Sequence, residues 1–195
     1  TNPDIYPERI FTDTDKTEFS LNEVDILAFS FSFELDFLGV FKIFDKYRIP
    51  FYAKERDEQF PLVIGGGPVL SANPEPYAEF FDAIIIGEGE EVLAEFIEKF
   101  REIKDLPSKK KQLEALAQIK GIYIPSLYEV NYSEDLAISD FEPVNNKAPA
   151  KVLKRCTPGS CRGTRQRRAG RARLGQGPNW KALRPGVPDE KVHTG

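Results

Sequence analysis

Residues 61–91 read PLVIGGGPVLSANPEPYAEFFDAIIIGEGEE. Two short apolar runs in this stretch, Leu62–Ile64 and Ala83–Ile86, each end abruptly in glycine. A β-branched run that stops at glycine and leads into a helical pattern is typical of a strand-to-helix turn. Two such turns close together predict one βαβ unit. Because ligands of open α/β sheets lie outside the carboxyl ends of the strands, we expect any small-molecule site at these glycine turns.

Strand and helix patterns alternate around this unit. Val24–Phe33 has the strongest strand pattern, an apolar core followed by phenylalanine at alternate positions. An amphipathic helix is predicted next, closed by Pro50, because apolar residues recur at helical spacing: Leu35, Leu38, Phe41, Ile43 or Phe44, and Tyr47. Further predicted elements are a strand at Arg9–Phe11, short and long helices at Tyr77–Phe81 and Glu90–Lys104, a helix ending at Gly121, strands at Ile122–Ile124 and Leu127–Tyr132, and a loop at Ser133–Ala150.

This alternation predicts an α/β fold with a flavodoxin- or Rossmann-like parallel sheet. A complete flavodoxin-like sheet has five strands in the order 2-1-3-4-5, and four candidate strands precede residue 90. We therefore expect the sheet to lack its first strand, which would lie upstream of Thr1 and pair between strands 2 and 3. Its loss would leave two unpaired edges and a poorly stable chain.

Charge and composition divide the chain sharply. Residues 1–150 carry 15 Lys and Arg against 29 Asp and Glu, a net of −14, whereas residues 151–195 carry 12 against 2, a net of +10. The last 45 residues also contain no Phe, Ile or Tyr. We predict a partial α/β domain at 1–105, a helix and small β excursion at 106–154, and a disordered basic tail at 155–195.

The chain begins with Thr, contains no Met, and has no apolar run of the length that a membrane span or a signal peptide needs. We interpret it as an internal fragment of a longer cytoplasmic protein without a membrane partner.

The candidate site residues lie at the predicted carboxyl ends of three strands. Gly65, Gly66 and Gly67 allow either close approach of a ligand or a tight turn without one. The acidic turn of Gly87, Glu88 and Gly89 favours capping of the next helix or a neutral or cationic ligand. No GxGxxG spacing and no P-loop lysine is present, which argues against a dinucleotide or triphosphate site.

Two serines, Ser30 and Ser32, lie among phenylalanines at the end of the first of these strands. Such polar side chains need a partner, which either a ligand or a nearby backbone group supplies. Glu34 and Asp36 are better explained as a solvated helix start than as an acid–base pair. The sequence offers no catalytic residue and no metal-ligand set.

Three segments together resemble a known family: SFSFELDFLGVFKIFDKYRIPF, the stretch at 61–91, and GIYIPSLYEV. They resemble the N-terminal region of radical S-adenosylmethionine (radical SAM) proteins, and more narrowly the group whose N-terminal part is a cobalamin-binding-like domain. The resemblance covers residues 1–154. It implies that Ser30 and Ser32 line the pocket for the nucleotide tail of cobalamin, that Gly65, Gly66 and Gly67 let the tail pass, and that Gly87, Glu88 and Gly89 border it.

The sequence also departs from this family. The Asp-x-His-x-x-Gly motif, whose histidine ligates cobalt from below, is absent, and the only histidine is His193. The family's [4Fe–4S] cluster uses three cysteines in a C-x-x-x-C-x-x-C run, whereas this chain has only Cys156 and Cys161, which we expect to be reduced thiols. The cluster, S-adenosylmethionine and the catalytic barrel are therefore expected only in a domain of the parent protein that this chain lacks, so that the chain alone would be inactive.

Three interpretations of the basic tail stay open. It is an arginine-rich arm that binds nucleic acid through phosphate contacts, a segment without a selected role, or the product of a frameshift or foreign junction near Arg155. We favour the last, because Arg, Gly, Pro and Ala have GC-rich codons and the resemblance ends where the composition changes. The alternative to a radical SAM fragment is thus a Rossmann-like binding module with a nucleic-acid-binding tail.

Overall fold

The structure is a computed structural model that describes residues 24–135 and 137–156. The chain divides into two units, Thr1–Cys161 and Arg162–Gly195, and the described residues belong to the first. The strand predicted at Arg9–Phe11 lies outside the described residues, as does the basic tail after Cys156.

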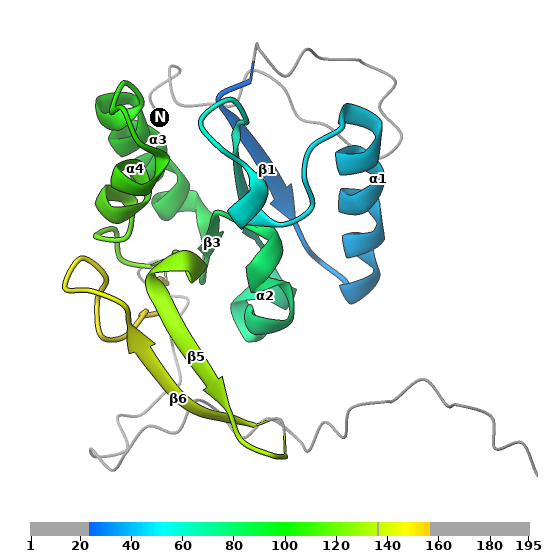
Figure 1. The fold of residues 1–195 in the computed structure, drawn as a ribbon, viewed down its shortest axis with the longest axis vertical. Helices are drawn as coiled ribbons and strands as arrows, with labels where there is room; N and C mark the ends of the chain where they lie inside the picture. The colour runs from blue at the N-terminus through cyan, green and yellow to red at the C-terminus, as the bar shows by residue number, and fades with distance from the viewer. Residues whose placement is uncertain (1–23, 136, 157–195) are drawn as a thin grey trace, which may run out of the picture. The chain divides into compact units, whose positions relative to one another are not determined.

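Four strands form one sheet in sequence order (Figure 1): β1 (Ile26–Ser30), β2 (Leu62–Gly66), β3 (Ala83–Ile85) and β4 (Ile122–Tyr123). The first three are parallel, and β4 runs antiparallel to β3. Neighbouring parallel strands in sequence order, connected by helices, are typical of open α/β sheets. The predicted α/β class is confirmed, and β1 forms an edge of the sheet within the described part of the chain.

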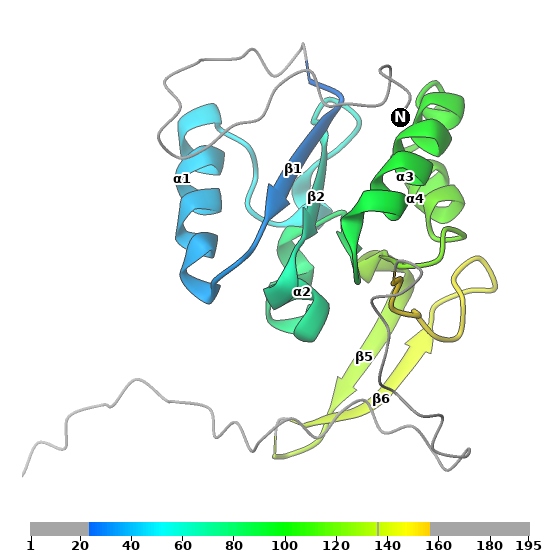
Figure 2. The same cartoon turned by 180° about the vertical axis from the view of Figure 1, so that it is seen from behind.

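Helices flank the sheet on both sides. Figures 1 and 2 show α1 (Phe37–Tyr47) on one side of the strands, and α3 (Gly89–Ile103) and α4 (Lys109–Leu116) on the other. The short helix α2 (Pro68–Ala72) and the 3₁₀ helix η5 (Glu75–Phe80) connect β2 to β3. The remaining elements are the 3₁₀ turns η3 (Glu34–Asp36), η4 (Ala53–Glu55) and η6 (Pro125–Leu127), and the antiparallel hairpin of β5 (Tyr128–Tyr132) and β6 (Ile138–Pro143).

The core is rich in phenylalanine on the side of α1 and α2. Phe31 contacts Phe81 edge to face with ring centroids 5.6 Å apart, and both are buried together with Phe44 and Leu70. On the other side, the buried stripe of α3 is the predicted one, with Val92, Phe96, Phe100 and Ile103. Burial of these large apolar side chains is the main force that holds helices to the sheet.

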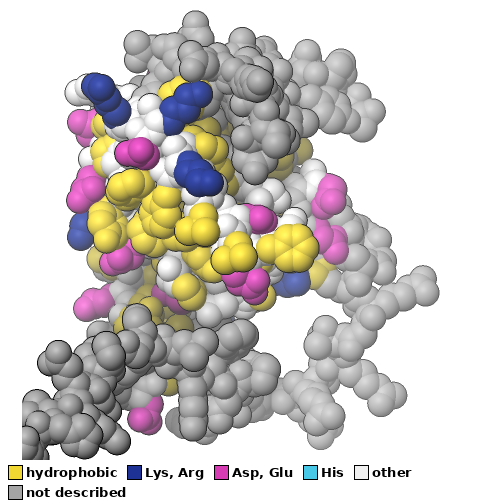
Figure 3. Space-filling model, turned by 90° about the vertical axis from the view of Figure 1, so that its right-hand side faces the viewer, with side chains coloured by type: hydrophobic (Ala, Val, Ile, Leu, Met, Phe, Trp, Pro, Cys, Tyr) yellow, Lys and Arg dark blue, Asp and Glu magenta, His cyan; other side chains and the backbone are white. Residues whose placement is uncertain are grey.

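Two predictions about local structure were wrong. The buried face of α1 carries Val40 and Phe44, and the predicted Ile43 and Tyr47 pack beside it. Leu35 and Leu38 are instead 77% and 58% exposed, because Leu35 lies in the 3₁₀ turn before the helix and Leu38 lies about 200° around the helix from Val40. Figure 3 shows hydrophobic side chains gathered in a band on the face that carries α1. The segment 133–150 is also not all loop, since Ile138–Pro143 pairs with β5.

One face of β1 is left uncovered by the described residues. Residues at alternate positions of a strand share a face, and Ala28 and Ser30 are exposed on the face where Ile64 and Ile85 of the neighbouring strands are buried. Parallel sheets are normally covered on both faces. The hollow over β1 is therefore the first place in the described fold to look for a ligand.

Candidate functional site

The three glycines at the end of β2 differ in how strictly the fold requires glycine at their positions. A Cβ atom at Gly65 would lie 2.6 Å from Leu70 Cδ1, so this position is small because α2 packs closely on the sheet. Gly67 has φ of +100°, and its Cβ would lie 2.5 Å from the Phe31 carbonyl oxygen, so the turn itself requires glycine. Gly66 has neither constraint, since its Cβ would only touch Ile85 at 3.5 Å.

The second glycine turn is held from three directions. Gly87 has φ of +118°, and its N–H donates to Ser71 Oγ of α2 at 2.9 Å. On either side of it, Ile86 N–H donates to the Gly121 carbonyl at 2.7 Å, and Glu88 N–H donates to the Arg155 carbonyl at 3.0 Å. The turn therefore connects α2, the segment before β4 and the last described residues.

A pocket of about 640 Å³ lies between these turns and the uncovered face of β1. Its floor is formed by Ala28 and Ser30 of β1, Ile64 of β2 and Ile85 of β3, while Leu93 comes from α3. Volumes of 300–1,000 Å³ with mostly apolar walls and a few polar groups are typical of small-molecule sites. The pocket is at the carboxyl ends of the parallel strands, where the sequence led us to expect a site.

Seven of the eight predicted site residues line this one pocket: Ser30, Gly65, Gly66, Gly67, Gly87, Glu88 and Gly89. Ser32 is not among its lining residues. Its N–H and that of Phe33 both donate to Asp36 Oδ2 at 2.9 Å, which fixes the loop after β1. The carboxylate of Asp36 thus caps a 3₁₀ turn, in agreement with the helix-start interpretation of this residue.

The charged groups of the pocket are Glu88, Glu90 and Lys154. Glu88 is the N-cap residue of α3, but its side chain makes no capping hydrogen bond. The carboxylates disfavour a ligand that is anionic throughout, and Lys154 offers a cation at one side. The balance suits a largely neutral ligand.

Sequence reasoning missed Ser71 and Lys154. Ser71 could have been predicted from the sequence, because it follows Gly67 by one helical turn, and a side chain at that position can reach the end of the next strand. Lys154 has no local signal, since it returns to the pocket only through the pairing of Arg155 with the Gly87 turn.

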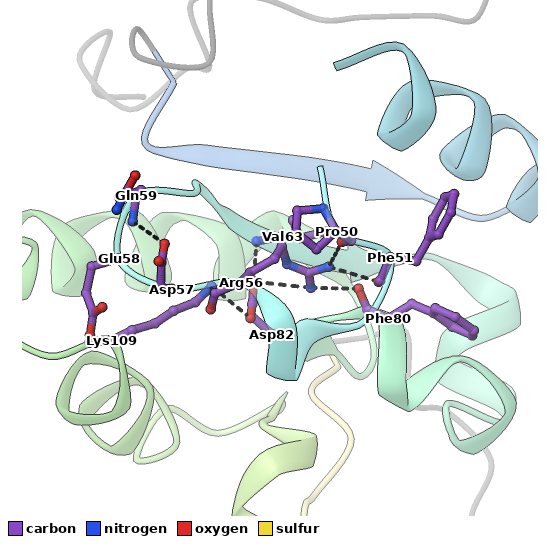
Figure 4. Close-up of polar contacts among 10 residues, drawn as sticks. All are labelled: Pro50, Phe51, Arg56, Asp57, Glu58, Gln59, Val63, Phe80, Asp82 and Lys109. Atoms are coloured by element: carbon purple, nitrogen blue, oxygen red, sulfur yellow. Dashed lines mark hydrogen bonds and ion pairs between the residues drawn. The ribbon is translucent and has the colours of Figure 1, made fainter. Parts of the chain in front are cut away.

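A second polar cluster lies at the opposite, amino ends of the strands (Figure 4) and was also missed. Asp82 Oδ1 lies 3.1 Å from Lys109 Nζ, and Asp82 Oδ2 accepts from Val63 N–H at 2.8 Å and lies 3.5 Å from Arg56 Nη2. The Arg56 guanidinium also donates to three backbone carbonyls, those of Pro50, Phe51 and Phe80.

This cluster is buried, which explains its electrostatics. Burial lowers the pKa of Arg56 and the pKa of Lys109, and the carboxylate of Asp82 opposes both shifts. Almost every polar atom has a partner within the cluster; among the described residues only Arg56 Nε is buried without one. We therefore assign the cluster to structure, where it ties η4 and α4 to the start of β3.

The described residues contain no group of three or more His, Cys, Asp or Glu side chains that could hold a metal ion. Cys156 is disulfide-bonded, so the expectation of a reduced thiol at this position was wrong. In the part of the chain that the structure describes, no helix has both the length and the apolar character needed to cross a membrane.

Comparisons with known proteins address the resemblance directly. Neither the curated proteins nor the solved structures gave a match to this chain. Residues 2–125, more than half of the chain, match the family described as radical SAM proteins, N-terminal. That match includes β1, β2, β3 and the helices between them, with every residue assigned to the pocket except Lys154. The chain belongs to the family of radical SAM protein N-terminal regions.

Proposed function

We propose that this chain provides a cobalamin-binding-like domain of a radical SAM protein and that the pocket between the glycine turns accepts the nucleotide tail of the cofactor. The observation that carries the proposal is that seven residues, which the resemblance assigns to the tail pocket, line a single hollow. They come from the ends of three strands, which the parallel sheet brings to one edge.

The chemistry of the pocket fits a tail better than it fits the cobalt centre. A Cβ at Gly89 would meet nothing within 4 Å, and one at Gly66 would only touch Ile85, so these positions leave room that larger side chains would fill. Ser30 offers a hydroxyl to a polar group. No histidine occurs among the described residues to ligate cobalt. Bound cobalamin would supply methyl-transfer or radical chemistry, while this chain's residues would hold the tail.

A spectral titration tests the proposal. Hydroxocobalamin is added to the chain and to a version extended at its amino terminus with the parent sequence, and the corrin absorption spectrum is followed. A saturable change in the spectrum is expected. The absence of any change at high micromolar concentration would refute binding.

The reaction itself belongs to the parent protein in this proposal. A catalytic radical SAM domain, with its [4Fe–4S] cluster and S-adenosylmethionine, would be the partner of this chain, which contributes no catalytic residue of its own. The two cysteines present cannot supply the three thiolates of such a cluster. The DNA sequence read in all frames past codon 155 tests this, because a C-x-x-x-C-x-x-C run in another frame is expected.

A second candidate function rests on the net charge of +10 carried by residues 151–195. An arginine-rich arm binds nucleic acid by neutralising phosphates and loses affinity as salt rises. Retention on immobilised RNA or DNA is compared at low and moderate salt for the full chain and for a chain that ends at residue 155. Equal retention of both would refute this function.

A further inference from the structure

We propose that the segment Val152–Arg155 forms a fourth wall of the pocket, beside β1 and the two glycine turns, and that Lys154 contacts the bound ligand, so that this segment is part of the site as well as a connection to residue 156 and beyond. The inference rests on the proposed binding function and deepens it. It assigns the ligand a chemical class: a mostly neutral molecule with one anionic group, such as a phosphodiester, on the side of Lys154.

The backbone of this segment pairs with the end of β3. Arg155 N–H donates to the Ile86 carbonyl and the Arg155 carbonyl accepts from Glu88 N–H, each at 3.0 Å, which is a parallel bridge at Gly87. A Cβ at Gly87 would overlap the carbonyl oxygen of Arg155, so the absence of a side chain at this turn is what lets the segment approach. The bridge therefore depends on a glycine that also lines the pocket.

Side chains hold the same segment from both sides. Arg155 Nη1 forms an ion pair with Glu95 Oε2 of α3 at 2.7 Å. Val152 packs against the hydrophobic core, and a Cβ at Gly121 would lie 2.9 Å from Arg155 Cβ. The segment is thus fixed within the described fold at the residues that flank Lys154.

Lys154 is the cation of the pocket. Lys154 lines the hollow together with Glu88 and Glu90, and it is exposed to solvent. Within the described part of the chain, Lys154 has no ion pair or hydrogen bond, whereas neighbouring Arg155 is engaged by Glu95. An ammonium group without a protein partner beside an otherwise neutral or acidic hollow is suited to an anionic group of a ligand.

Trypsin tests the wall because it cleaves after Lys and Arg. The full chain is digested with and without hydroxocobalamin, and cleavage after Lys154 and Arg155 is followed by mass spectrometry. At a ligand concentration ten times the dissociation constant, the open population and the cleavage rate should fall about tenfold. Cleavage after Lys110, which is exposed on α4 and does not line the pocket, should not change.

Two variants separate this inference from the proposed function. Glu95→Gln removes the ion pair to Arg155 and should speed cleavage after Lys154 without any ligand. Lys154→Gln should weaken retention of hydroxocobalamin in equilibrium dialysis by about three- to tenfold, whereas Lys151→Gln, exposed and outside the pocket, should not.

If hydroxocobalamin is retained but neither protects Lys154 nor responds to Lys154→Gln, the fourth wall is refuted and the binding function stands. If no hydroxocobalamin is retained, the proposed function fails, and the ligand contact of Lys154 fails with it. Equal cleavage of Glu95→Gln and the unchanged chain would refute the wall without reference to any ligand.

Discussion

At the amino ends of the parallel strands, two cationic side chains are buried around one carboxylate, whereas at the carboxyl ends the polar groups face a hollow of about 640 Å³. Asp82 is 4% exposed and bonds to Arg56, Lys109 and the backbone of β2. At the other end Ser30 is exposed, and Lys154 has no partner among the described residues. The two ends belong to the same strands, but the charged side chains at the amino ends are paired by the protein, whereas Ser30 and Lys154 at the carboxyl ends have no partner among the described residues.

This difference between the two ends distinguishes the residues that stabilise the fold from those that are available to a ligand. Buried charges that pair with each other and with backbone carbonyls fix the packing of the elements that carry them. At the carboxyl ends, Gly67 and Gly87 allow the positive φ of their turns and Gly87 N–H bonds to Ser71, so part of this end is structural as well. The exposed side chains of Ser30 and Lys154, however, have no partner among the described residues. We therefore place the ligand beside these two side chains and assign the buried charges at the amino ends to stability, a division that substitutions at either end can test.

The largest effect is expected for Asp82→Ala. The substitution leaves the buried cations Arg56 and Lys109 without their counter-charge, so the free energy of unfolding should fall by about 3–5 kcal/mol. Urea unfolding followed by circular dichroism measures it. The control is Glu102→Ala, which removes a surface ion pair with Lys99 and should cost at most about 1 kcal/mol. Equal losses in both variants would contradict a structural role for the cluster.

A smaller loss of stability is expected for Gly67→Ala. A side chain at a φ of +100° and against the Phe31 backbone should lower the free energy of unfolding by about 1–3 kcal/mol. Gly39→Ala is the matched control, because Gly39 lies inside α1 with nothing within 4 Å of its Cβ position. That substitution should raise stability by about 0.5–1 kcal/mol. A neutral Gly67→Ala would show that the turn is less constrained than its geometry indicates.

The smallest effect is expected for Ser30→Ala, which should leave stability nearly unchanged and weaken retention of hydroxocobalamin about three- to tenfold through the loss of one hydrogen bond. Ser32→Ala is the matched control, because Ser32 does not line the pocket and only its backbone bonds to Asp36. Equilibrium dialysis of both variants compares them. Equal affinity of the two variants would show that Ser30 does not contact the ligand.

Most of the fold could be predicted from local patterns, because the buried strands are continuous apolar runs and α3 has a clear apolar stripe. The strand β6 was missed for the opposite reason, since ISDFEP is largely exposed and its pairing with β5 decides its structure. The cluster joins Asp82 to Arg56 and Lys109, which lie 26 and 27 positions away in the sequence. Contacts between residues so far apart leave no periodic pattern from which they could be predicted. The glycine turns could be predicted because a positive φ or a close backbone approach favours glycine, which the sequence shows directly. Lys154, in contrast, reaches the pocket only through tertiary structure.

Ligand binding at the carboxyl ends is tested most directly at Gly66, the glycine that the fold does not require. Gly66→Val keeps a strand-compatible residue on β2 and fills the hollow from its floor. Equilibrium dialysis with hydroxocobalamin compares this variant with the unchanged chain, and urea unfolding checks that both are folded. We predict that the unchanged chain retains hydroxocobalamin and that folded Gly66→Val does not. Equal retention by the two proteins, or none by the unchanged chain, would contradict a binding pocket at this end of the sheet.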